Sequence, residues 1–567
     1  MPLRTHISSF RTSDGTDVTV PPGGVVLFVG PNNVGKSVAL RDVAGLLVNP
    51  PEQVQPKVVI SLEVETEGTG DELITWLDEH CDSKDRGAHV EYSRLGSGAV
   101  PLPNLLSFWN SGSPFNRLGN FFTYLANAAQ RLGAANSAQM IDFLNEPPNH
   151  PLHKLYFDPG REQELSDLAQ EAFGEGLVVN RVAGTQIHLH VGEAPPWGDN
   201  PGVPSPEYRA AIADLPLLSQ QGDGMKSFLG VMLHVAFDHY YFVFIDEPEA
   251  FLHPPQATLL GRRLAADKNE STQLFMATHN SDILRGVLDA DDAEVTVVRL
   301  TREGDVNPTS QLEPHLVREL WRDPLLRYSN LLDGLFHDSV VLCEADGDCR
   351  FFGSLVDVLS ETEVWIARPQ VLFAHCGGMH RMPTAIQALL AVDVPVRVIT
   401  DFDILRDEVP LRRIVESLGG EWERFVGDWT VVRAALDSLG QPIQVNYVRQ
   451  RILDALDNEE EADLSKDGQD QIRALVRPDT GWRDAKRGGL GAVPQGEPSE
   501  RCIALVRNLE ELGLFVTPVG ELERWVPTVS GHGPAWVTEV HAQDLHRTEE
   551  TSAAKDFVRQ VIDSLGH

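Results

Sequence analysis

Cysteine is scarce in this sequence. The 567 residues include five cysteines, an odd number in which no two form a CxxC pair. A disulfide-stapled secreted protein or a zinc module built on paired cysteines is therefore not indicated. Cys343 and Cys349 lie six residues apart, but no second Cys/His pair has a matching spacing, so we expect ordinary thiols in a reducing cytoplasm. The five are Cys81, Cys343, Cys349, Cys376 and Cys502.

Long apolar segments are also lacking. The longest nearly uncharged stretch lies near FLGVMLHVAF and is too short to cross a bilayer. The start of the chain, MPLRTHISSF, has no apolar core of the kind found in signal peptides. We therefore expect a cytoplasmic protein that makes no membrane contact.

Positive charge is in short supply. Lys plus Arg is 47 and Asp plus Glu is 83, so the formal net charge is 47 − 83 = −36. Such a chain repels nucleic acid on average, and contact with DNA would need local basic patches or bound metal cations. Hydrophobic residues make up 42% of the chain, which indicates a globular protein long enough for two or more domains.

A phosphate-binding motif is present near the start. Residues 30–37, GPNNVGKS, satisfy the pattern G-x-x-x-x-G-K-[ST] between a strand-like run, VVLFV, and a helix-like run, VALRDVAGLL. Gly30, Asn33 and Gly35 would let backbone N–H groups surround phosphate oxygens at the positive end of the helix. Lys36 can reach the β- and γ-phosphates and Ser37 can hold Mg²⁺. The motif predicts a site for ATP with Mg²⁺.

An acidic strand end supplies the second half of this site. The apolar run FVFI ends in Asp246, which would hold Mg²⁺, and Glu247, which would polarise the attacking water. Gly222 and Gly224 lie one helix upstream, where their small size allows close backbone approach to a nucleotide. His279 follows the next strand, QLFMAT, where it could sense a γ-phosphate.

The order of these parts resembles that of ABC-type ATPases. In that class two nucleotide sites close face to face, so the resemblance implies a homodimer or a higher homo-oligomer. Lys36 and Asp246 are 210 residues apart, which suggests a dimerisation lobe inserted at about 90–210. Within it we expect helical pieces such as FFTYLANAAQRLGAA.

Acidic residues also follow two strand-like runs in the second half of the chain. Glu344 and Asp348 follow VVLC, and Asp401 and Asp403 follow VRVIT. Parallel strands end along one edge of an open α/β sheet, so these loops would build a shared site. Four carboxylates there need a cation, and hard oxygen ligands favour Mg²⁺ or Mn²⁺. Such ions activate water and offset the charge of a phosphodiester.

A resemblance follows from these acids. Together with the Gly377-Gly378 step they are similar to a Toprim domain, the metal-binding fold of topoisomerases and primases. An ABC-type ATPase followed by Toprim resembles the OLD-family (overcoming lysogenisation defect) ATP-dependent nucleases, which include the nuclease subunit of the Gabija anti-phage system. The resemblance implies an ATPase and a Mg²⁺- or Mn²⁺-dependent endonuclease of double-stranded DNA. It also implies a role in anti-phage defence or DNA processing, and a helicase-like partner.

The resemblance assigns roles to the acids of the second half. Glu344, Asp401 and Asp403 would be catalytic metal ligands, and Asp348 matches the second acid of the nuclease branch. Ala345 follows Glu344 where the family usually has glycine.

The resemblance extends to the end of the chain. The strand-like run LFVTPV leads into GELE, which resembles the family's late acidic motif, with Glu521 or Glu523 as a further metal ligand. The family also uses a lysine near the C-terminus to stabilise the pentavalent phosphate. Lys555 fits by position and Lys486 is the alternative. Asp346 fits no ligand position, so we expect it in the outer shell or facing solvent.

The expected organisation is α/β throughout. An ABC/SMC-like ATPase domain would span 1–310, a linker helix 311–336, and a Toprim nuclease domain 337–567 with a helical insertion at about 410–510. An acidic run at 457–470 would be a solvated face or loop.

Two other interpretations remain open. The run VITDFD also resembles the first motif of HAD phosphatases, in which Asp401 would be a nucleophile. Alternatively, the protein is an ATP-switched DNA-repair scaffold whose Toprim domain is inactive. The sequence leaves open whether ATP activates or inhibits cleavage.

Overall fold

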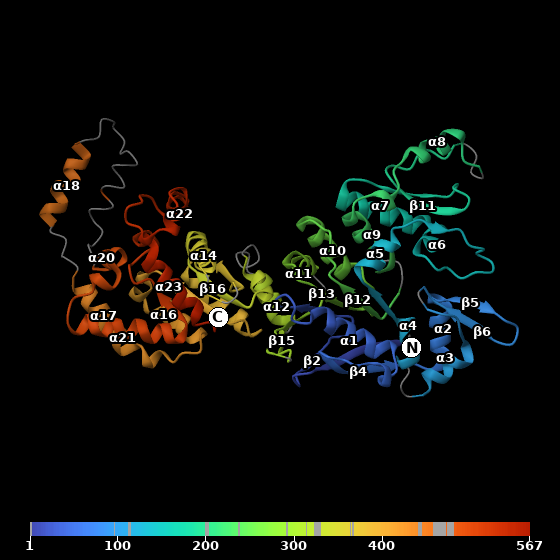
Figure 1. Ribbon diagram of the computed structural model, residues 1–567, viewed down its shortest axis with the longest axis horizontal. Coiled ribbons are helices and arrows are strands. Elements are labelled where there is room, and N and C mark those ends of the chain that lie inside the picture. Colours follow the sequence, from blue (N-terminus) through green and yellow to red (C-terminus); the bar gives the residue numbers. More distant parts are fainter. Residues whose placement is uncertain are drawn as a thin grey trace. The chain divides into compact units, whose positions relative to one another are not determined.

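Two compact units make up the chain, Met1–Arg322 and Asp323–His567 (Figure 1). The computed structural model describes residues 3–95, 97–111, 115–198, 203–235, 239–290, 293–304, 306–312, 314–322, 330–362, 365, 368–439, 445–457, 472 and 481–566. Apart from its first residue, the acidic run predicted at 457–470 lies outside these ranges.

A six-stranded sheet forms the centre of the first unit, in the order β15-β14-β3-β13-β12-β8. All pairings are parallel except that of β15 with β14. Both faces of a parallel sheet are covered, which explains why every residue of β3 and β13 is buried. The strands are β3 (Val25–Val29), β8 (Thr123–Ala126), β12 (Phe242–Asp246), β13 (Gln273–Ala277), β14 (Val295–Leu300) and β15 (Thr309–Leu312).

Helix α1 (Lys36–Val48) packs against strands of this sheet and against β4 of a smaller antiparallel sheet. That smaller sheet has the order β2-β1-β4. One apolar core joins α1 to both sheets, with Phe10 and Phe28 in contact at its centre. The remaining strands of the unit are β1 (Arg4–Thr12), β2 (Asp17–Thr19), β4 (Val59–Glu67), β5 (Asp82–Asp85), β6 (Val90–Ser93), β7 (Val100–Pro101), β9 (Ala138–Gln139), β10 (Leu177–Asn180) and β11 (Gln186–Val191).

The helical prediction for FFTYLANAAQRLGAA is wrong in its middle. Residues Thr123–Ala126 form β8, the edge strand of the central sheet, between α4 and α5. Parallel pairing with the buried strand β12 outweighs the local helical tendency here. Asn127 then caps α5 reciprocally with Gln130. The segment at 90–210, expected to be an inserted lobe, therefore contributes one strand to the central sheet.

Helices of the first unit surround these sheets. They are α2 (Gly70–His80), α3 (Leu102–Trp109), α4 (Phe115–Phe122), α5 (Ala128–Ala134), α6 (Pro151–Leu155), α7 (Pro159–Phe173), α8 (Pro206–Asp214), α9 (Asp223–Val235), α10 (Pro254–Ala266), α11 (Ser281–Leu288) and α12 (Pro314–Arg322). In the range 311–336, predicted as a linker helix, the structure describes the end of β15, α12 and a 3₁₀ helix at Leu331–Phe336, and residues 323–329 lie outside the described ranges.

A four-stranded parallel sheet forms the second unit, in the order β17-β16-β18-β19. One of its faces shares a core with α14, α22 and α23, in which Phe351 contacts Trp536 and Phe352 contacts Phe557. The elements are β16 (Ser339–Cys343), α14 (Asp346–Glu361), β17 (Val371–His375), α15 (Met382–Leu390), β18 (Val396–Thr400), β19 (Leu514–Val516), α22 (Gly533–Ala542) and α23 (Ser552–Asp563).

The described chain between β18 and β19, where we expected a helical insertion, is mostly helical. Its helices are α16 (Glu408–Ser417), α17 (Val426–Ser438), α18 (Val445–Asp457), α20 (Gly481–Gly488) and α21 (Glu497–Leu512). The α/β class predicted from sequence thus describes both units. Within the described ranges, no helix is both long and apolar enough to cross a membrane.

Candidate functional site

The phosphate-binding loop connects β3 to α1. Gly30, Asn33 and Gly35 all have positive φ, at 135°, 65° and 95°. A side chain at Gly30 would place its Cβ 2.1 Å from the Leu300 carbonyl oxygen, so only glycine fits there. Lys36 opens α1, and its Nζ donates to the carbonyls of Gly30 (2.8 Å) and of Pro31 (2.7 Å).

Strand β12, which ends in Asp246 and is called the acid strand below, lies next to β13 and near Lys36. Glu247 N donates to Ala277 O at 2.8 Å, continuing the pairing of the two strands. Burial lowers the pKa of Lys36, while the charges of Asp246 and Glu247 act in the opposite direction. Asp246 Oδ1 is buried and has no hydrogen-bond partner among the described residues, as expected of an atom that binds a cation. Lys36, Asp246 and Glu247 are therefore brought together, and Ser37 follows Lys36 on α1.

Glu249 is a site residue that the sequence reading missed. It is buried, and its Oε1 accepts hydrogen bonds from Thr278 Oγ1 (2.8 Å) and His279 N (2.9 Å). The same oxygen lies 3.1 Å from His279 Nδ1, and the His279 ring is half-exposed. Glu249 thus orients the histidine predicted to sense a γ-phosphate. The sequence did carry a signal for Glu249, because it is the third acid of the run DEPE, in which we used only Asp246 and Glu247.

Arg131 is a second residue that the sequence reading missed. Its side chain is fully buried on α5, and burial lowers its pKa. The guanidinium donates to the carbonyls of Asp246 (2.6 Å) and Glu247 (2.9 Å) and to Ser227 Oγ (3.2 Å). It therefore fixes the end of the acid strand to α5 and α9. Only the tertiary structure shows this role, because the sequence around Arg131 carries no motif.

Replacing Arg131 by Met should destabilise the first unit. The change leaves the carbonyls of Asp246 and Glu247 buried without their donor, at a cost of about 1–3 kcal/mol for each unsatisfied group. We expect the thermal unfolding midpoint to fall by several degrees and ATP turnover to fall with it. Arg262→Met is the control, since Arg262 pairs with Glu171 at the surface and should shift unfolding little. Equal midpoints for the two variants would contradict this role of Arg131.

The two glycines expected to approach a nucleotide lie at the start of α9. A Cβ at Gly224 would lie 2.7 Å from the Phe251 carbonyl oxygen, whereas a Cβ at Gly222 would meet no atom within 4 Å. Phe251 itself has a φ of 71° and is exposed. The cap on a partner's nucleotide remains a prediction for both glycines.

A carboxylate cluster lies at the carboxyl edge of the second sheet. Glu344 follows β16 and Asp401 follows β18, and Asp401 N donates to Glu344 Oε1 at 3.1 Å. Asp348 lies in the first turn of α14, where its Oδ2 accepts from Ala345 N at 2.9 Å. The acids of two separate strand ends therefore meet, as the parallel arrangement predicts. Asp346 is instead exposed and pairs with Arg350 at 2.7 Å.

Burial and mutual repulsion raise the pKa values of this cluster. Burial, together with the charge of Asp403, raises the pKa of Glu344 to about 7. Burial, with the charge of Glu523 added, raises the pKa of Asp348 to about 6. Burial and the charges of Glu344 and Asp348 raise the pKa of Asp401 to about 9. The cluster therefore retains protons at neutral pH unless cations compensate its charge.

The lysine at this cluster is Lys486, the alternative in our sequence reading. Its Nζ donates to Asp403 Oδ2 at 2.8 Å. Burial lowers the pKa of Lys486, but the hydrogen bond and the acidic charges outweigh burial and raise it. Lys555 instead lies on α23 and donates to the Thr548 carbonyl at 2.8 Å. Helix α20 of the helical insertion brings Lys486 to the acids, and the role of Lys555 remains a prediction.

The two late glutamates act on different members of the cluster. Glu521 is buried, lies 3.3 Å from Arg524 Nε, and its charge acts on Lys486. Glu523 Oε1 accepts from Gly533 N at 2.7 Å, and its charge acts on Asp348.

The oxygen atoms of the cluster are ligands that a hard cation prefers, but the described side chains are not arranged to coordinate one as they stand. No group of three or more His, Cys, Asp or Glu side chains in the described ranges is arranged to hold a metal as it stands. Asp403 Oδ1 is nevertheless buried with no partner among the described residues. The surrounding oxygens repel one another, and hard oxygen donors suit Mg²⁺ or Mn²⁺.

Comparisons with known proteins bear on the first unit. Residues 107–285 match the family described as "AAA domain, putative AbiEii toxin, Type IV TA system". This range includes β12 and His279 but not the phosphate-binding loop. No curated protein matches the chain.

Similar solved structures include heads of SMC proteins and a transporter subunit. One is the SMC head domain from Thermotoga maritima, at 15% identity and TM-score 0.27, covering 55% of this chain and 100% of that one. Another is an Smc head domain bound to the C-terminal domain of ScpA, derived from Pyrococcus furiosus, at 10% identity and TM-score 0.31, covering 56% and 99%. A third is an ATP-binding cassette of an ABC transporter in its ADP conformation, at 12% identity and TM-score 0.24, covering 57% and 96%.

These TM-scores are too low to support an argument, so the assignment depends on the family match and the loop geometry. Gly30, Gly35 and Lys36 form a phosphate-binding loop, and the acids after β12 face it. The first unit therefore combines a segment similar to AAA-type ATPase domains with a loop of the phosphate-binding kind.

Proposed function

We propose that this protein is an ATP-controlled, metal-dependent endonuclease of double-stranded DNA, with its cutting site in a Toprim-like second unit. The observation that carries the proposal is the contact of Asp401 with Glu344, at the carboxyl edge of a parallel sheet and beside the Asp403–Lys486 pair. The resemblance to OLD-family nucleases adds a role in anti-phage defence or DNA processing.

The residues of the cluster would have different roles in the cleavage of a phosphodiester. Glu344, Asp348, Asp401 and Asp403 would hold Mg²⁺ or Mn²⁺, and Glu521 or Glu523 would complete the set. When bound, such ions activate water and stabilise charge on the phosphate. Lys486 would donate to a phosphate oxygen and lower the cost of its added negative charge. Cations at this site would also reduce the repulsion of DNA by a chain with net charge −36.

The first unit would act as the regulator of cutting. ATP would bind the phosphate-binding loop, with Glu247 polarising the attacking water and Glu249 orienting His279. Gly222 and Gly224 would approach the nucleotide of a second copy, which makes a homodimer the smallest assembly with complete sites.

The test is cleavage of supercoiled plasmid with metal and ATP varied independently. We expect loss of supercoiled DNA with Mg²⁺ or Mn²⁺ and none with a chelator. We also expect ATP to change the rate, and the direction of that change is what the titration measures. Absence of metal-dependent cleavage at every ATP concentration would contradict the proposal.

Two lysine variants identify the residue that stabilises the phosphate. Lys486→Met should reduce cleavage by about 100-fold, because a charged donor at the phosphate is worth roughly 3 kcal/mol. Lys555→Met should stay within about threefold of the unchanged protein, since Lys555 on α23 donates to the backbone carbonyl of Thr548. Initial rates on plasmid DNA check both, and the opposite ranking would return the role to Lys555.

The scaffold interpretation has one observation in its favour, namely that the acids are not arranged as a finished metal site. Thermal unfolding separates it from the nuclease proposal. A working site should gain about 2.7 kcal/mol of stability at a metal concentration 100 times its dissociation constant. An inactive one should show no such gain. The HAD interpretation is less well supported, because Asp401 follows β18 and not the first strand of its sheet.

A further inference from the structure

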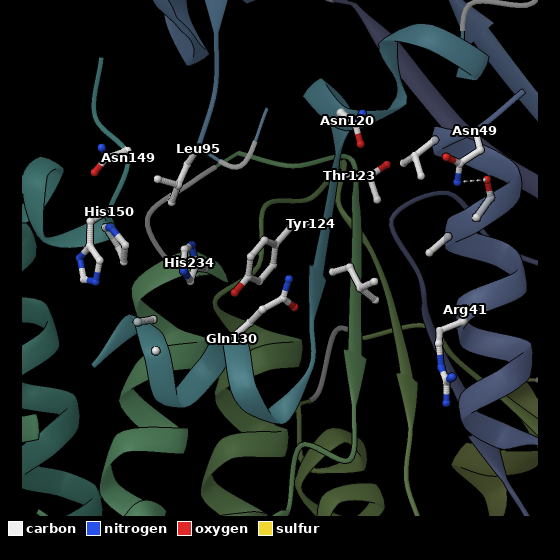
Figure 2. A pocket seen from close by; sticks show the side chains of 17 residues that line it. Arg41, Asn49, Leu95, Asn120, Thr123, Tyr124, Gln130, Asn149, His150 and His234 are labelled. Atoms are coloured by element: carbon white, nitrogen blue, oxygen red, sulfur yellow. Dashed lines mark hydrogen bonds between the residues drawn. The ribbon is translucent and has the colours of Figure 1, made fainter. Parts of the chain in front are cut away.

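A cavity of about 500 Å³ lies in the first unit beside the edge strand β8 (Figure 2). Its walls come from α1, α4, β8, α5, the start of α6 and the end of α9. None of its lining residues belongs to the phosphate-binding loop, to the acid strand or to the carboxylate cluster. The volume lies within the range of about 300–1,000 Å³ that is usual for small-molecule sites.

The lining is rich in hydrogen-bonding groups, and none of the described lining residues carries a carboxylate, although the chain has 83 acidic residues. The lining includes four amide side chains, those of Asn49, Asn120, Gln130 and Asn149, and Figure 2 shows Gln130 beside the ring of Tyr124 in the middle of the view. Arg41 is the permanently charged side chain among the described lining residues. Burial lowers the pKa of His150 to about 4, so its ring is neutral at physiological pH.

Several of these groups are already held in position. The rings of Tyr124 and His234 stack with centroids 4.5 Å apart. Gln130 Oε1 accepts from Asn127 N at 3.0 Å, which fixes its amide at the start of α5. Thr123 Oγ1 is buried at the cavity and has no hydrogen-bond partner among the described residues.

The walls also connect the cavity to the ATP site. Helix α1 begins at Lys36, and Arg41 Nε donates to Ser37 O at 2.9 Å. Helix α5 carries Arg131, which holds the carbonyls of Asp246 and Glu247. A ligand between α1 and α5 therefore touches two elements that position opposite sides of the nucleotide site.

We propose that this cavity is an effector site for a purine nucleoside or its monophosphate, and that its occupancy alters ATP turnover. An amide presents one donor and one acceptor, the pattern that pairs with the edge of adenine. Aromatic rings offer contact surface for a flat base. Arg41 supplies a partner for one phosphate, and the described lining residues include no carboxylate that would repel an anion.

The binding test uses the full chain with Lys36→Ala, so that the phosphate-binding loop contributes little. Adenosine 5′-monophosphate and adenosine are titrated separately by calorimetry, and tighter binding of the monophosphate would show that Arg41 holds a phosphate. We expect dissociation constants below about 1 mM. Adding Gly133→Leu should weaken both by at least tenfold.

Gly133 is suited to this test because it lines the cavity and a Cβ there meets no atom within 4 Å. Leucine also has the higher helix propensity, so α5 should not be weakened. Gly427→Leu is the matched control, since Gly427 lies in α17 of the other unit and also has open space at Cβ. It should leave binding unchanged. The proposed site would be overturned if neither ligand bound to the Lys36→Ala protein, or if both bound equally well with and without the added Gly133→Leu change.

The coupling is tested in the protein with Lys36 intact. Adenosine 5′-monophosphate should change the ATP turnover rate by at least about threefold, and this effect should disappear in Gly133→Leu but persist in Gly427→Leu. Binding without a change in turnover would overturn the coupling. Neither measurement depends on DNA cleavage, so these results stand apart from those on the proposed nuclease.

Discussion

Replacing Asp401 by Asn is expected to reduce metal-dependent plasmid cleavage by about a thousandfold or more. Asp401 lies where the ends of β16 and β18 meet, in contact with Glu344. The substitution keeps the shape of the side chain but removes the charge that would hold a cation. A loss of about 4 kcal/mol in stabilisation of the reacting phosphate corresponds to this factor. Initial rates of supercoiled plasmid loss in Mg²⁺ and in Mn²⁺ provide the measurement.

The control for this variant is Asp346→Asn. Asp346 comes from the same loop as Glu344, but it is exposed and pairs with Arg350. Its replacement should leave cleavage within about twofold. Asp401→Asn should also be at least as stable as the unchanged protein without metal, because burial and the neighbouring acids raise the pKa of Asp401 to about 9. Cleavage that survives Asp401→Asn at more than a tenth of the original rate would move the cutting site elsewhere.

The parts of the fold that could be predicted are those in which local pattern and tertiary role agree. The run VVLFV-GPNNVGKS predicted a strand, a loop and a helix, and β3 and α1 form there. At β16 and β18, a strand followed by acidic residues could be predicted equally well, because the apolar residues and the acids that follow them are adjacent in sequence. Their meeting at one edge follows from the parallel topology.

The parts that could not be predicted depend on contacts distant in sequence. Thr123–Ala126 becomes a strand because β12, more than a hundred residues later, offers it a partner. Arg131 receives its role from carbonyls on that same strand. Lys486 reaches Asp403 only because the helical insertion folds back on the sheet, and its distance along the chain gave no indication of this.

Replacing Lys36 by Ala is expected to weaken ATP binding by about 100-fold. The ammonium group of Lys36 lies inside the phosphate-binding loop, donating to the carbonyls of Gly30 and Pro31, and near the acids that follow β12. A charged hydrogen bond to the β- and γ-phosphates contributes roughly 3 kcal/mol, which corresponds to this factor. Calorimetric titration with ATP and Mg²⁺ measures the change.

Lys268→Ala is the matched control for this measurement. Lys268 is also a partly buried lysine whose Nζ donates to a backbone carbonyl, that of Gly23 at 2.5 Å, and burial lowers its pKa in the same way. It lies after α10 and outside the loop, so ATP affinity should stay within about threefold. Equal losses in the two variants would mean that any buried lysine of this unit supports binding indirectly. A selective loss in Lys36→Ala, combined with cleavage that no longer responds to ATP, would place the control of cutting in this loop.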